Sequence, residues 1–393
     1  MSKKIVLAFS GGLDTTVIAH FLIQRGFTVI GFLANLGQTI EDLTVIQQNA
    51  QKIGLTKLVA QDLQQEFLHD FVLPGLTSAA RYENYYLLGT ALARPLIAQA
   101  QVKLARKLGA EFLAHGATGK GNDQIRFELT WHALNPSVKK WIPWREPDFY
   151  QKFGGRREML AYARKFKLPV KASKSKPWSS DENLLHISFE AGVLEDLTRI
   201  PPTTMFELTK DPLKAPNKVT KIKLDFECGL PSKLNGKKLP TLTIFKQLNR
   251  LGGLNAIGRV DLVENRFLGL KSRGIYETPG GTILWHALRL LESLTIPAQE
   301  IHARDRSAPE FAELIYNGFW FSKRAQTLLK QIKKLQQKIT GAVELGLYKG
   351  NVIPLKRSAP NSLYDAVQTT FESDGIYRPT QATKFIQRQL KNL

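Results

Sequence analysis

Five apolar residues near the N-terminus run directly into a serine, two glycines and an aspartate, in the stretch IVLAFSGGLDTT, residues 5–16. An apolar, β-branched run of this length is typical of a buried strand, and apolar side chains recur at helical spacing after Asp14. Glycines between a strand and a helix permit a tight turn, because they adopt positive φ without steric cost. The stretch therefore predicts a strand, a sharp turn and a helix.

The same alternation continues through the first part of the chain. Short apolar runs at residues 28–33, 58–60 and 111–114 predict further strands, and the patterns at residues 43–53 and 89–108 predict helices between them. Strands that alternate with helices at this spacing favour a parallel sheet covered on both faces. The predicted fold class is α/β, with a doubly wound parallel sheet of the nucleotide-binding kind.

Composition changes near residue 168, where prolines and a lysine-rich segment interrupt the alternation. Residues 219–236 and 257–276 alternate as antiparallel strands do, whereas residues 282–294 and 310–334 are predicted to be helical. A chain of 393 residues suits two or three domains of about 100–200 residues each. We expect a nucleotide-binding domain at residues 1–167, an α+β domain at residues 168–364, and a C-terminal helical arm at residues 365–393.

The chain carries 55 Lys and Arg against 34 Asp and Glu, a net charge of +21. Such an excess is typical of proteins that bind nucleic acid or another polyanion. Residues 1–100 hold seven basic and seven acidic residues, so the excess lies downstream, notably at residues 139–176 and 323–357. A solvated surface and a field that concentrates anionic ligands both account for this charge.

The sequence contains no run of 18 apolar residues and no secretory signal pattern, so we expect neither a membrane span nor export. The single cysteine, Cys228, excludes an intramolecular disulfide and a cysteine zinc cluster. These observations favour a reducing compartment, and we expect a cytoplasmic location.

The turn at residues 8–16 has three interpretations. It is a purely structural turn with Asp14 early in the helix, or a nucleophile elbow, although no earlier strand supplies the oxyanion hole that an elbow needs. As an anion cradle, it would bind phosphate through backbone N–H groups and the hydroxyls of Ser10, Thr15 and Thr16. No G-x-x-x-x-G-K-[ST] motif occurs, so the cradle is not a mononucleotide P-loop. Asp14 would then orient the loop or meet Mg²⁺ carried by a nucleotide.

A second polar loop, HGATGKGNDQIRFE at residues 115–128, follows the strand predicted at residues 111–114. Its three glycines let the backbone approach a small ligand, and polar or cationic side chains lie among and after them: Thr118, Lys120, Asn122, Asp123 and Arg126. An amino acid needs an acceptor for its ammonium group, which Asp123 suits, and donors for its carboxylate, which Thr118, Asn122 and Arg126 suit. His115 is either a structural residue or a base for an amine.

The S-G-G-x-D-[ST] pattern after an N-terminal strand resembles the pyrophosphate loop of the ATP pyrophosphatases, whose domain is adenine nucleotide alpha hydrolase-like. The whole chain from Leu7 to Tyr364 resembles the argininosuccinate synthase family. Besides the two polar loops, the motifs that carry this resemblance are YYLLGTALARP at residues 85–95, KPWSSDENLLHISFEAG at 176–192 and VENRFLGLKSRGIYETP at 263–279. The resemblance implies an AMP-forming carbon–nitrogen ligase of arginine biosynthesis and the urea cycle. In that family the ureido oxygen of citrulline attacks the α-phosphorus of ATP, pyrophosphate leaves, and the aspartate amine displaces AMP.

The resemblance also implies residue roles. ATP would contact Ala8, Phe9, Ser10, Gly11, Gly12, Leu13, Asp14, Thr15, Thr16, Ala34 and Gly116. Aspartate would contact Thr118, Asn122 and Asp123. Citrulline would contact Tyr86, Ala91, Asn122, Arg126, Ser179, Ser188, Glu264 and Tyr276. Ser10, Asp14 and Arg126 would act in the reaction itself, through positioning and charge stabilisation rather than covalent catalysis.

Further expectations follow from the resemblance: ATP with Mg²⁺ as co-substrate, no resident metal site, a homotetramer whose C-terminal tail crosses between subunits, and no membrane or nucleic-acid partner. Ala91 departs from the hydroxyl residue of some members, and Thr16 replaces a frequent serine. The alternatives are a tRNA-adenylating modification enzyme and a non-enzymatic nucleic-acid-binding module. Thiolating versions of the first need cysteine pairs, lysidine-type versions leave residues 115–128 and 176–192 unexplained, and a binding module would not need SGGLDT.

Overall fold

Strand β1 (Lys4–Ala8) lies at the centre of a five-stranded parallel sheet in the computed structural model, in the order β3-β2-β1-β4-β5. The structure describes residues 3–39, 42–119, 121–170, 176–370, 372, 378 and 380–391. The other strands of this sheet are β2 (Thr28–Asn35), β3 (Lys57–Asp62), β4 (Phe112–Ala114) and β5 (Lys139–Trp141). The strand order reverses between β1 and β4, where open sheets of this kind bind ligands. The doubly wound parallel sheet predicted from the sequence is confirmed.

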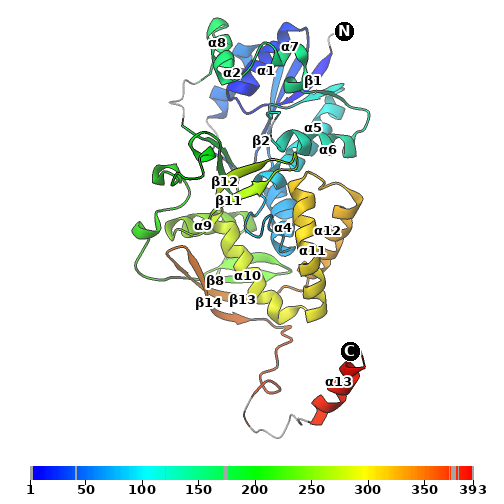
Figure 1. Ribbon diagram of the computed structural model, residues 1–393, viewed down its shortest axis with the longest axis vertical. Coiled ribbons are helices and arrows are strands. Elements are labelled where there is room, and N and C mark those ends of the chain that lie inside the picture. Colours follow the sequence, from blue (N-terminus) through cyan, green and yellow to red (C-terminus); the bar gives the residue numbers. More distant parts are fainter. Residues whose placement is uncertain are drawn as a thin grey trace.

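Side chains of β1 alternate between the two faces of this sheet, as the strand period of two requires. Ile5 and Leu7 join the apolar cluster of one face, and Val6 joins the cluster of the other. The first face is covered by α1 (Leu13–Gln24), α2 (Leu43–Ile53), α7 (Pro147–Tyr150) and α8 (Arg156–Lys165). The second is covered by α5 (Gly89–Leu108) and α6 (Asp123–Leu134). Figure 1 shows this layered domain at the N-terminal end of the molecule.

The second half of the chain contains two antiparallel sheets. One has the order β11-β12-β7-β6 and comprises β6 (Ser179–Glu182), β7 (Ile187–Glu190), β11 (Arg259–Asn265) and β12 (Lys271–Glu277). In its register Tyr276 lies opposite Ser188, and Ser188 lies opposite Asp181, so these side chains fall in one row across the sheet. This sheet borders the N-terminal domain (Figure 1).

The other antiparallel sheet has the order β10-β9-β8-β13-β14. Its strands are β8 (Thr220–Glu227), β9 (Leu230–Leu234), β10 (Lys237–Lys238), β13 (Gly341–Tyr348) and β14 (Asn351–Ser358). Four long helices accompany the two sheets: α9 (Thr241–Leu254), α10 (Pro279–Thr295), α11 (Ala298–Tyr316) and α12 (Lys323–Gln336). Ile222 and Leu224 alternate with exposed lysines along β8 and pack inward, which gives this sheet one buried and one solvated face.

The prediction of one helix across residues 310–334 is wrong. The structure has two helices there, α11 and α12, separated by residues 317–322. Gly318 takes φ +89° just after α11 ends, and Ser322 accepts a hydrogen bond from the backbone N–H of Ala325 to cap α12. Both helices turn an apolar face to the core, so the apolar pattern runs through the junction and hides it.

The remaining elements are short. They are α3 (Gln64–Glu66), a π-helical turn (Phe67–Val72), α4 (Leu73–Thr77), and 3₁₀ turns at Pro143–Arg145, Gly192–Glu195, Thr203–Met205 and Pro212–Lys214. Within the described ranges, no helix combines the length and apolar character needed to cross a bilayer.

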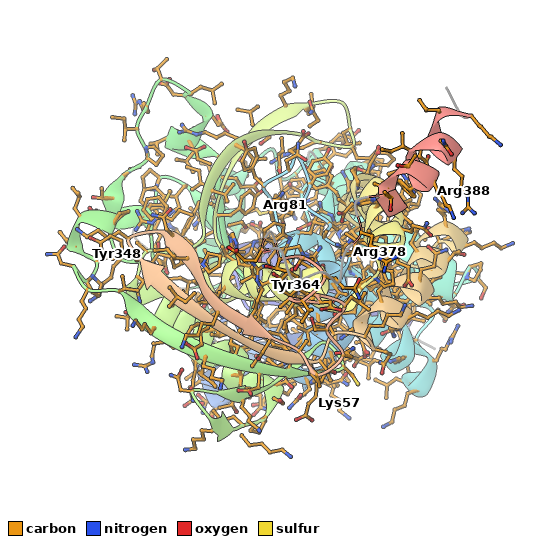
Figure 2. The ribbon with its side chains drawn as sticks, turned by 90° about the horizontal axis from the view of Figure 1, so that it is seen from below. Lys57, Arg81, Tyr348, Tyr364, Arg378 and Arg388 are labelled. Atoms are coloured by element: carbon orange, nitrogen blue, oxygen red, sulfur yellow. The ribbon has the colours of Figure 1, made fainter. Side chains whose placement is uncertain are left out.

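The chain leaves the body of the molecule after β14. The backbone N–H of Leu363 donates to the carbonyl of Leu294 at 2.7 Å, and beyond it α13 (Thr380–Leu390) stands apart from both domains (Figure 1). Figure 2 shows Arg388 on this helix at the periphery of the molecule. Phe385 and Ile386 on α13 are exposed. The expected arm at residues 365–393 thus contains a helix, and residues 371, 373–377, 379, 392 and 393 lie outside the described residues.

Candidate active site

A cavity of about 710 Å³ opens where β1, β2 and β4 end, and the antiparallel sheet that carries β6 and β7 forms its opposite wall. All residues assigned to ligands from the sequence line this cavity, except Gly11, Thr16 and Ala91. Gly11 and Thr16 belong to the loop and to the first turn of α1, and Ala91 is fully buried in α5. Residues 8–15, 116–119, 121–126, 179–188 and 264–276 therefore meet around one space, although they are far apart in the sequence.

The loop between β1 and α1 has the features of an anion site. Gly11 takes φ +79°, and α1 begins at Leu13 with no side-chain cap, so N–H groups of its first turn remain available to a ligand. Ser10 Oγ accepts from the backbone N–H of Gly12 at 3.3 Å and lies 3.2 Å from Thr15 Oγ1. The hydroxyls thus hold the loop's own shape and face the cavity.

Gly116 lets the second polar loop lie against this turn. A Cβ atom on Gly116 would lie 2.8 Å from Cγ2 of Thr15, closer than packed carbon atoms approach. The two loops after β1 and β4 are therefore in direct contact, and together they form the nucleotide end of the cavity.

Asp14 lines the cavity in the first turn of α1. Burial raises the pKa of its carboxyl group, and the positive charge of Arg156 partly offsets that increase. Among the described residues no group of three His, Cys, Asp or Glu side chains is placed to hold a metal. A single carboxylate beside a phosphate loop fits Mg²⁺ that arrives with the nucleotide, because Mg²⁺ binds through one or two carboxylates plus substrate phosphates.

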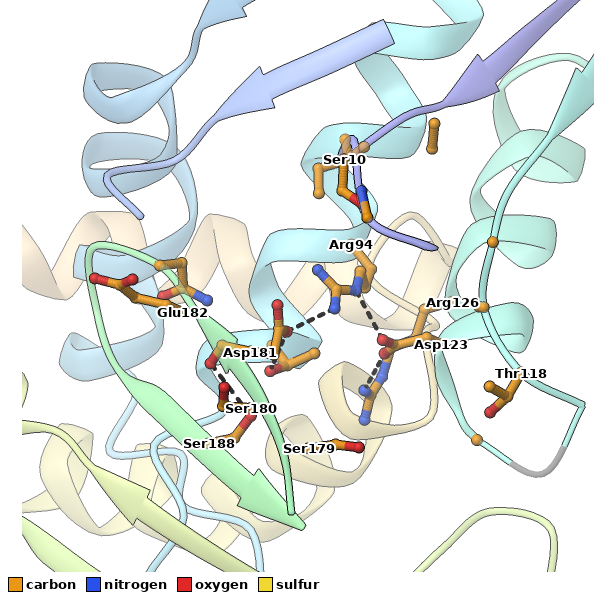
Figure 3. A pocket seen from close by; sticks show the side chains of 18 of the residues that line it. Ser10, Arg94, Thr118, Asp123, Arg126, Ser179, Ser180, Asp181, Glu182 and Ser188 are labelled. Atoms are coloured by element: carbon orange, nitrogen blue, oxygen red, sulfur yellow. Dashed lines mark hydrogen bonds and ion pairs between the residues drawn. The ribbon is translucent and has the colours of Figure 1, made fainter. Parts of the chain in front are cut away.

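A chain of ion pairs crosses the middle of the cavity (Figure 3). Asp123 accepts from Arg94 Nε at 2.8 Å on one oxygen and from Arg126 Nη1 at 2.8 Å on the other. Arg94 Nη2 also donates to Asp181 at 2.6 Å, and Arg126 Nε donates to the carbonyl of Tyr316 at 2.9 Å. Two guanidinium groups and two carboxylates are thus fixed relative to one another before any ligand binds.

These pairs keep the groups charged. Burial alone would raise the pKa of Asp123, but Arg94 and Arg126 hold it below its usual value. Burial would likewise lower the pKa of Arg126, and Asp123 reverses that effect and raises it. A guanidinium group held in place and charged is suited to bind a carboxylate through two parallel hydrogen bonds.

A second buried group with a carboxylate lies at the far end of the cavity. The hydroxyl of Tyr276 donates to Glu264 Oε2 at 2.9 Å, and the Tyr276 ring stacks on Tyr86 at 4.1 Å between centroids. Burial raises the pKa of Glu264, and the Tyr276 hydrogen bond partly counters that rise. The arrangement offers an ammonium group one carboxylate in an aromatic, largely dry surrounding.

Asn122 connects the two halves of the molecule. Its Oδ1 accepts from the backbone N–H of Phe267, in the turn between β11 and β12, at 3.2 Å. Because Oδ1 is occupied in this way, the amide NH₂ of Asn122 is the part that can donate to a ligand. Thr118, Ser179 and Ser188 also line the cavity, and Ser188 Oγ donates to the carbonyl of Asp181 at 3.4 Å.

The structure favours a structural role for His115. Its side chain is fully buried, its Nδ1 accepts from the backbone N–H of Ala117 at 3.2 Å, and its ring stacks on Trp131. Burial lowers its pKa to about 4, so the imidazole is neutral near neutral pH. His115 is not among the described residues that line the cavity. Lys120, which the sequence placed in the same polar loop, lies outside the described residues.

Sequence reasoning missed several polar residues of the cavity. Arg94 is the most central of them. The one sign of it in the sequence is an arginine among the buried apolar residues of ALARP in helix α5. Thr90 connects it to a buried histidine, because Thr90 Oγ1 donates to Asp181 at 3.1 Å and lies 3.0 Å from His186 Nε2. Since the single Thr90 proton goes to the carboxylate, His186 must carry its proton on Nε2.

Comparisons with known proteins identify both halves of the chain. The family model described as "Arginosuccinate synthase N-terminal HUP domain" matches residues 4–169, and "Arginosuccinate synthase C-terminal domain" matches residues 178–391. A protein of Thermotoga maritima named argininosuccinate synthase is 49% identical over 391 residues, which cover 98% of this chain and 95% of that protein. Proteins of the same name from Syntrophus aciditrophicus and Danio rerio are 49% and 44% identical over 385 and 393 residues, covering 98% of this chain and 95% and 94% of those proteins.

Proposed function

The chain belongs to the argininosuccinate synthase family, and from that premise we propose how its cavity binds ATP, citrulline and aspartate. The family consists of ligases that form carbon–nitrogen bonds, so the chain is an enzyme of arginine biosynthesis and uses ATP as a substrate. The observation that carries the proposal is that a phosphate loop and the Arg94–Asp123–Arg126 ion pairs face one cavity.

ATP occupies the nucleotide end in this proposal. The loop of Ser10, Gly11 and Gly12 and the first turn of α1 bind the phosphates, and Ala34 and Gly116 border the nucleoside. Magnesium that arrives with ATP neutralises phosphate charge, and Asp14 orients the loop and faces that ion. Catalysis is positioning plus charge stabilisation, as in other phosphoryl and nucleotidyl transfers.

Citrulline occupies the far end. Its ammonium group pairs with Glu264, its carboxylate pairs with Arg126 and the Ser179 and Ser188 hydroxyls, and Tyr86 packs along its side chain. The ureido oxygen then points toward the loop, where it attacks the α-phosphorus and pyrophosphate leaves. Aspartate binds beside Thr118, Asn122 and Asp123, and its amine displaces AMP from the adenylate.

One incubation tests this proposal. With ATP, Mg²⁺, citrulline and aspartate, the protein is expected to produce AMP, pyrophosphate and argininosuccinate in equal amounts, and to need citrulline for pyrophosphate release. Citrulline labelled with heavy oxygen at the ureido group is expected to transfer the label to AMP. Formation of ADP, AMP release that is indifferent to citrulline, or unlabelled AMP would each contradict it.

The assembly and location are also proposals. The relatives' family and the exposed apolar residues Phe385 and Ile386 on α13 support a homotetramer in which the C-terminal arm packs on another subunit. The single, exposed Cys228 supports the cytoplasm, where thiols stay reduced. Membranes and nucleic acids are not proposed as partners, and the net charge of +21 is assigned to the solvated surface.

A further inference from the structure

Most of the charges in the cavity are already paired. Of the four arginines that line it among the described residues, Arg94 and Arg126 pair with Asp123, and Arg266 pairs with Glu190. Arg156, the fourth, has no hydrogen bond or ion pair with any described residue. Among the described residues that line the cavity, it is therefore the one guanidinium group that is not paired with a carboxylate of the protein.

The cavity also carries more acid than base. Six carboxylates line it against the four guanidinium groups, and no described lysine does. A triphosphate that enters such a space meets net negative charge, and only part of that charge is offset by the dipole of α1. A free cation at the nucleotide end would remove much of this repulsion.

Arg156 is at that end. It is the first residue of α8, it follows the glycine pair Gly154 and Gly155, and its exposed side chain lies at the rim of the cavity. Helix α8 packs on α1, the helix that begins in the phosphate loop, and Tyr162 of α8 hydrogen-bonds to His20 of α1 at 2.9 Å. Arg156 and Asp14, in the first turn of α1, line the same cavity, and the positive charge of Arg156 lowers the pKa of the Asp14 carboxyl group.

We propose that Arg156 binds the β- and γ-phosphates of ATP and holds the pyrophosphate group while its bond to the α-phosphorus breaks. This assignment rests on the proposed function, because it names a phosphate ligand of the same site. The planar guanidinium group makes two parallel hydrogen bonds to oxygens of the β- and γ-phosphates. AMP lacks both phosphates, so Arg156 contributes to the binding of pyrophosphate and not to the binding of AMP. Arg156 takes no proton and forms no covalent bond in this role.

The chain contains a matched control beside it. Arg157 is also exposed and also in the first turn of α8, but it does not line the cavity. Arg157→Ala removes the same charge from the same helix end, so it reports any general effect of net charge or of helix stability.

Direct binding to the full-length protein gives the test. We would measure the affinities for magnesium pyrophosphate and for AMP by titration calorimetry, for the wild type and for Arg156→Ala, Arg156→Lys and Arg157→Ala. Arg156→Ala is expected to weaken pyrophosphate about tenfold or more, Arg156→Lys less, and Arg157→Ala by no more than about twofold. AMP binding is expected to stay within about twofold in all three variants. Equal pyrophosphate affinity in wild type and Arg156→Ala, or an equal loss for AMP, would overturn the proposal.

The activity assay separates this proposal from the one on which it rests. If Arg156→Ala makes argininosuccinate with an unchanged KM for ATP, the assignment of Arg156 fails while the function stands. If the wild type binds pyrophosphate through Arg156 yet makes no argininosuccinate, the function fails while the phosphate ligand stands. Thermal unfolding of each variant checks that the fold is intact, and the exposure of Arg156 leads us to expect no change.

Discussion

Tyr276 donates a hydrogen bond from its hydroxyl to the carboxylate of Glu264 at 2.9 Å, and both side chains are buried. The two residues come from neighbouring strands, β12 and β11, whose register brings them to one end of the cavity. Burial favours the neutral form of Glu264, whereas the hydrogen bond favours the carboxylate. The charge available to a bound ammonium group therefore depends on this contact.

Tyr276→Phe is expected to raise the KM for citrulline about tenfold, because a buried carboxylate loses a hydrogen bond. The pKa of Glu264 is already raised and would rise further without this hydrogen bond. Citrulline binding needs the carboxylate, so on acidification the variant would lose citrulline binding at a higher pH than the wild type does. Measuring this KM from mildly acidic to neutral pH checks the shift. Tyr85→Phe, at an exposed ring, serves as the control, and identical pH profiles for both variants would refute the role given to Glu264.

Asp14→Asn is expected to slow pyrophosphate release about a hundredfold, because the loop loses the carboxylate that is proposed to orient it and to face the magnesium ion. Asparagine has the same shape, so the melting temperature should change little. The measurement is pyrophosphate release under saturating substrates, accompanied by thermal unfolding. Unchanged turnover would show that the carboxylate of Asp14 has no part in the reaction.

Arg126→Ala is expected to raise the KM for citrulline about a hundredfold and to leave the KM for ATP within about threefold. The reason is its contacts, since Arg126 pairs with Asp123 and donates to the carbonyl of Tyr316, and it makes no hydrogen bond to the phosphate loop at residues 8–16. Initial rates with each substrate varied in turn provide the check, with Arg106→Ala on the exposed side of α5 as control. Equal loss for both substrates would contradict the assigned contact.

Gly89→Ala is expected to destabilise the fold by about 1–3 kcal/mol, because a Cβ at this position would lie 2.4 Å from ring carbons of His186. The displaced imidazole would also disturb Thr90 and, through it, Asp181. Denaturant unfolding measures the first effect. Gly154→Ala, where the added methyl group meets nothing within 4 Å, should leave the free energy of unfolding nearly unchanged.

Deleting residues 365–393 is expected to reduce the number of subunits in the assembly, as measured by sedimentation. The reason is that the arm, with its exposed Phe385 and Ile386, is proposed to pack on another subunit. The full-length chain should sediment as a tetramer and the shortened chain as a smaller species. A monomer for the full-length chain, or an unchanged tetramer after deletion, would remove this role from the arm.

The fold of the first half could be predicted from the sequence because its signals are local. Strand β1 is a short, continuous apolar run, whereas helix α5 shows a helical pattern, and Gly109 marks the end of that helix with φ +60°. The boundary between α11 and α12 could not be predicted, because the apolar residues of both helices face the same core. The apolar pattern therefore continues on both sides of Asn317 and Gly318, where the first helix ends.

The site was predictable to the extent that motifs carried it. Ser10, Asp14, Asp123 and Arg126 stand out as polar residues in or just after glycine-rich loops at strand ends, and they line the cavity. Arg94 sits within a helix, and only its pairing with Asp123 and Asp181 from other elements shows what it does. Interactions of this kind depend on tertiary distances, which periodicity does not contain.

The hydrogen bond from Phe267 to Asn122 spans 145 positions of the chain and joins a hairpin of one half to a loop of the other. Because the donor is a backbone N–H, every residue except proline can supply it at position 267, so the alignment of the Asn122 amide depends on the path of the hairpin and not on the side chain at its tip. Insertions or deletions in this hairpin would therefore disturb a substrate-facing amide in the other half of the chain, whereas most substitutions at its tip would leave that amide in place.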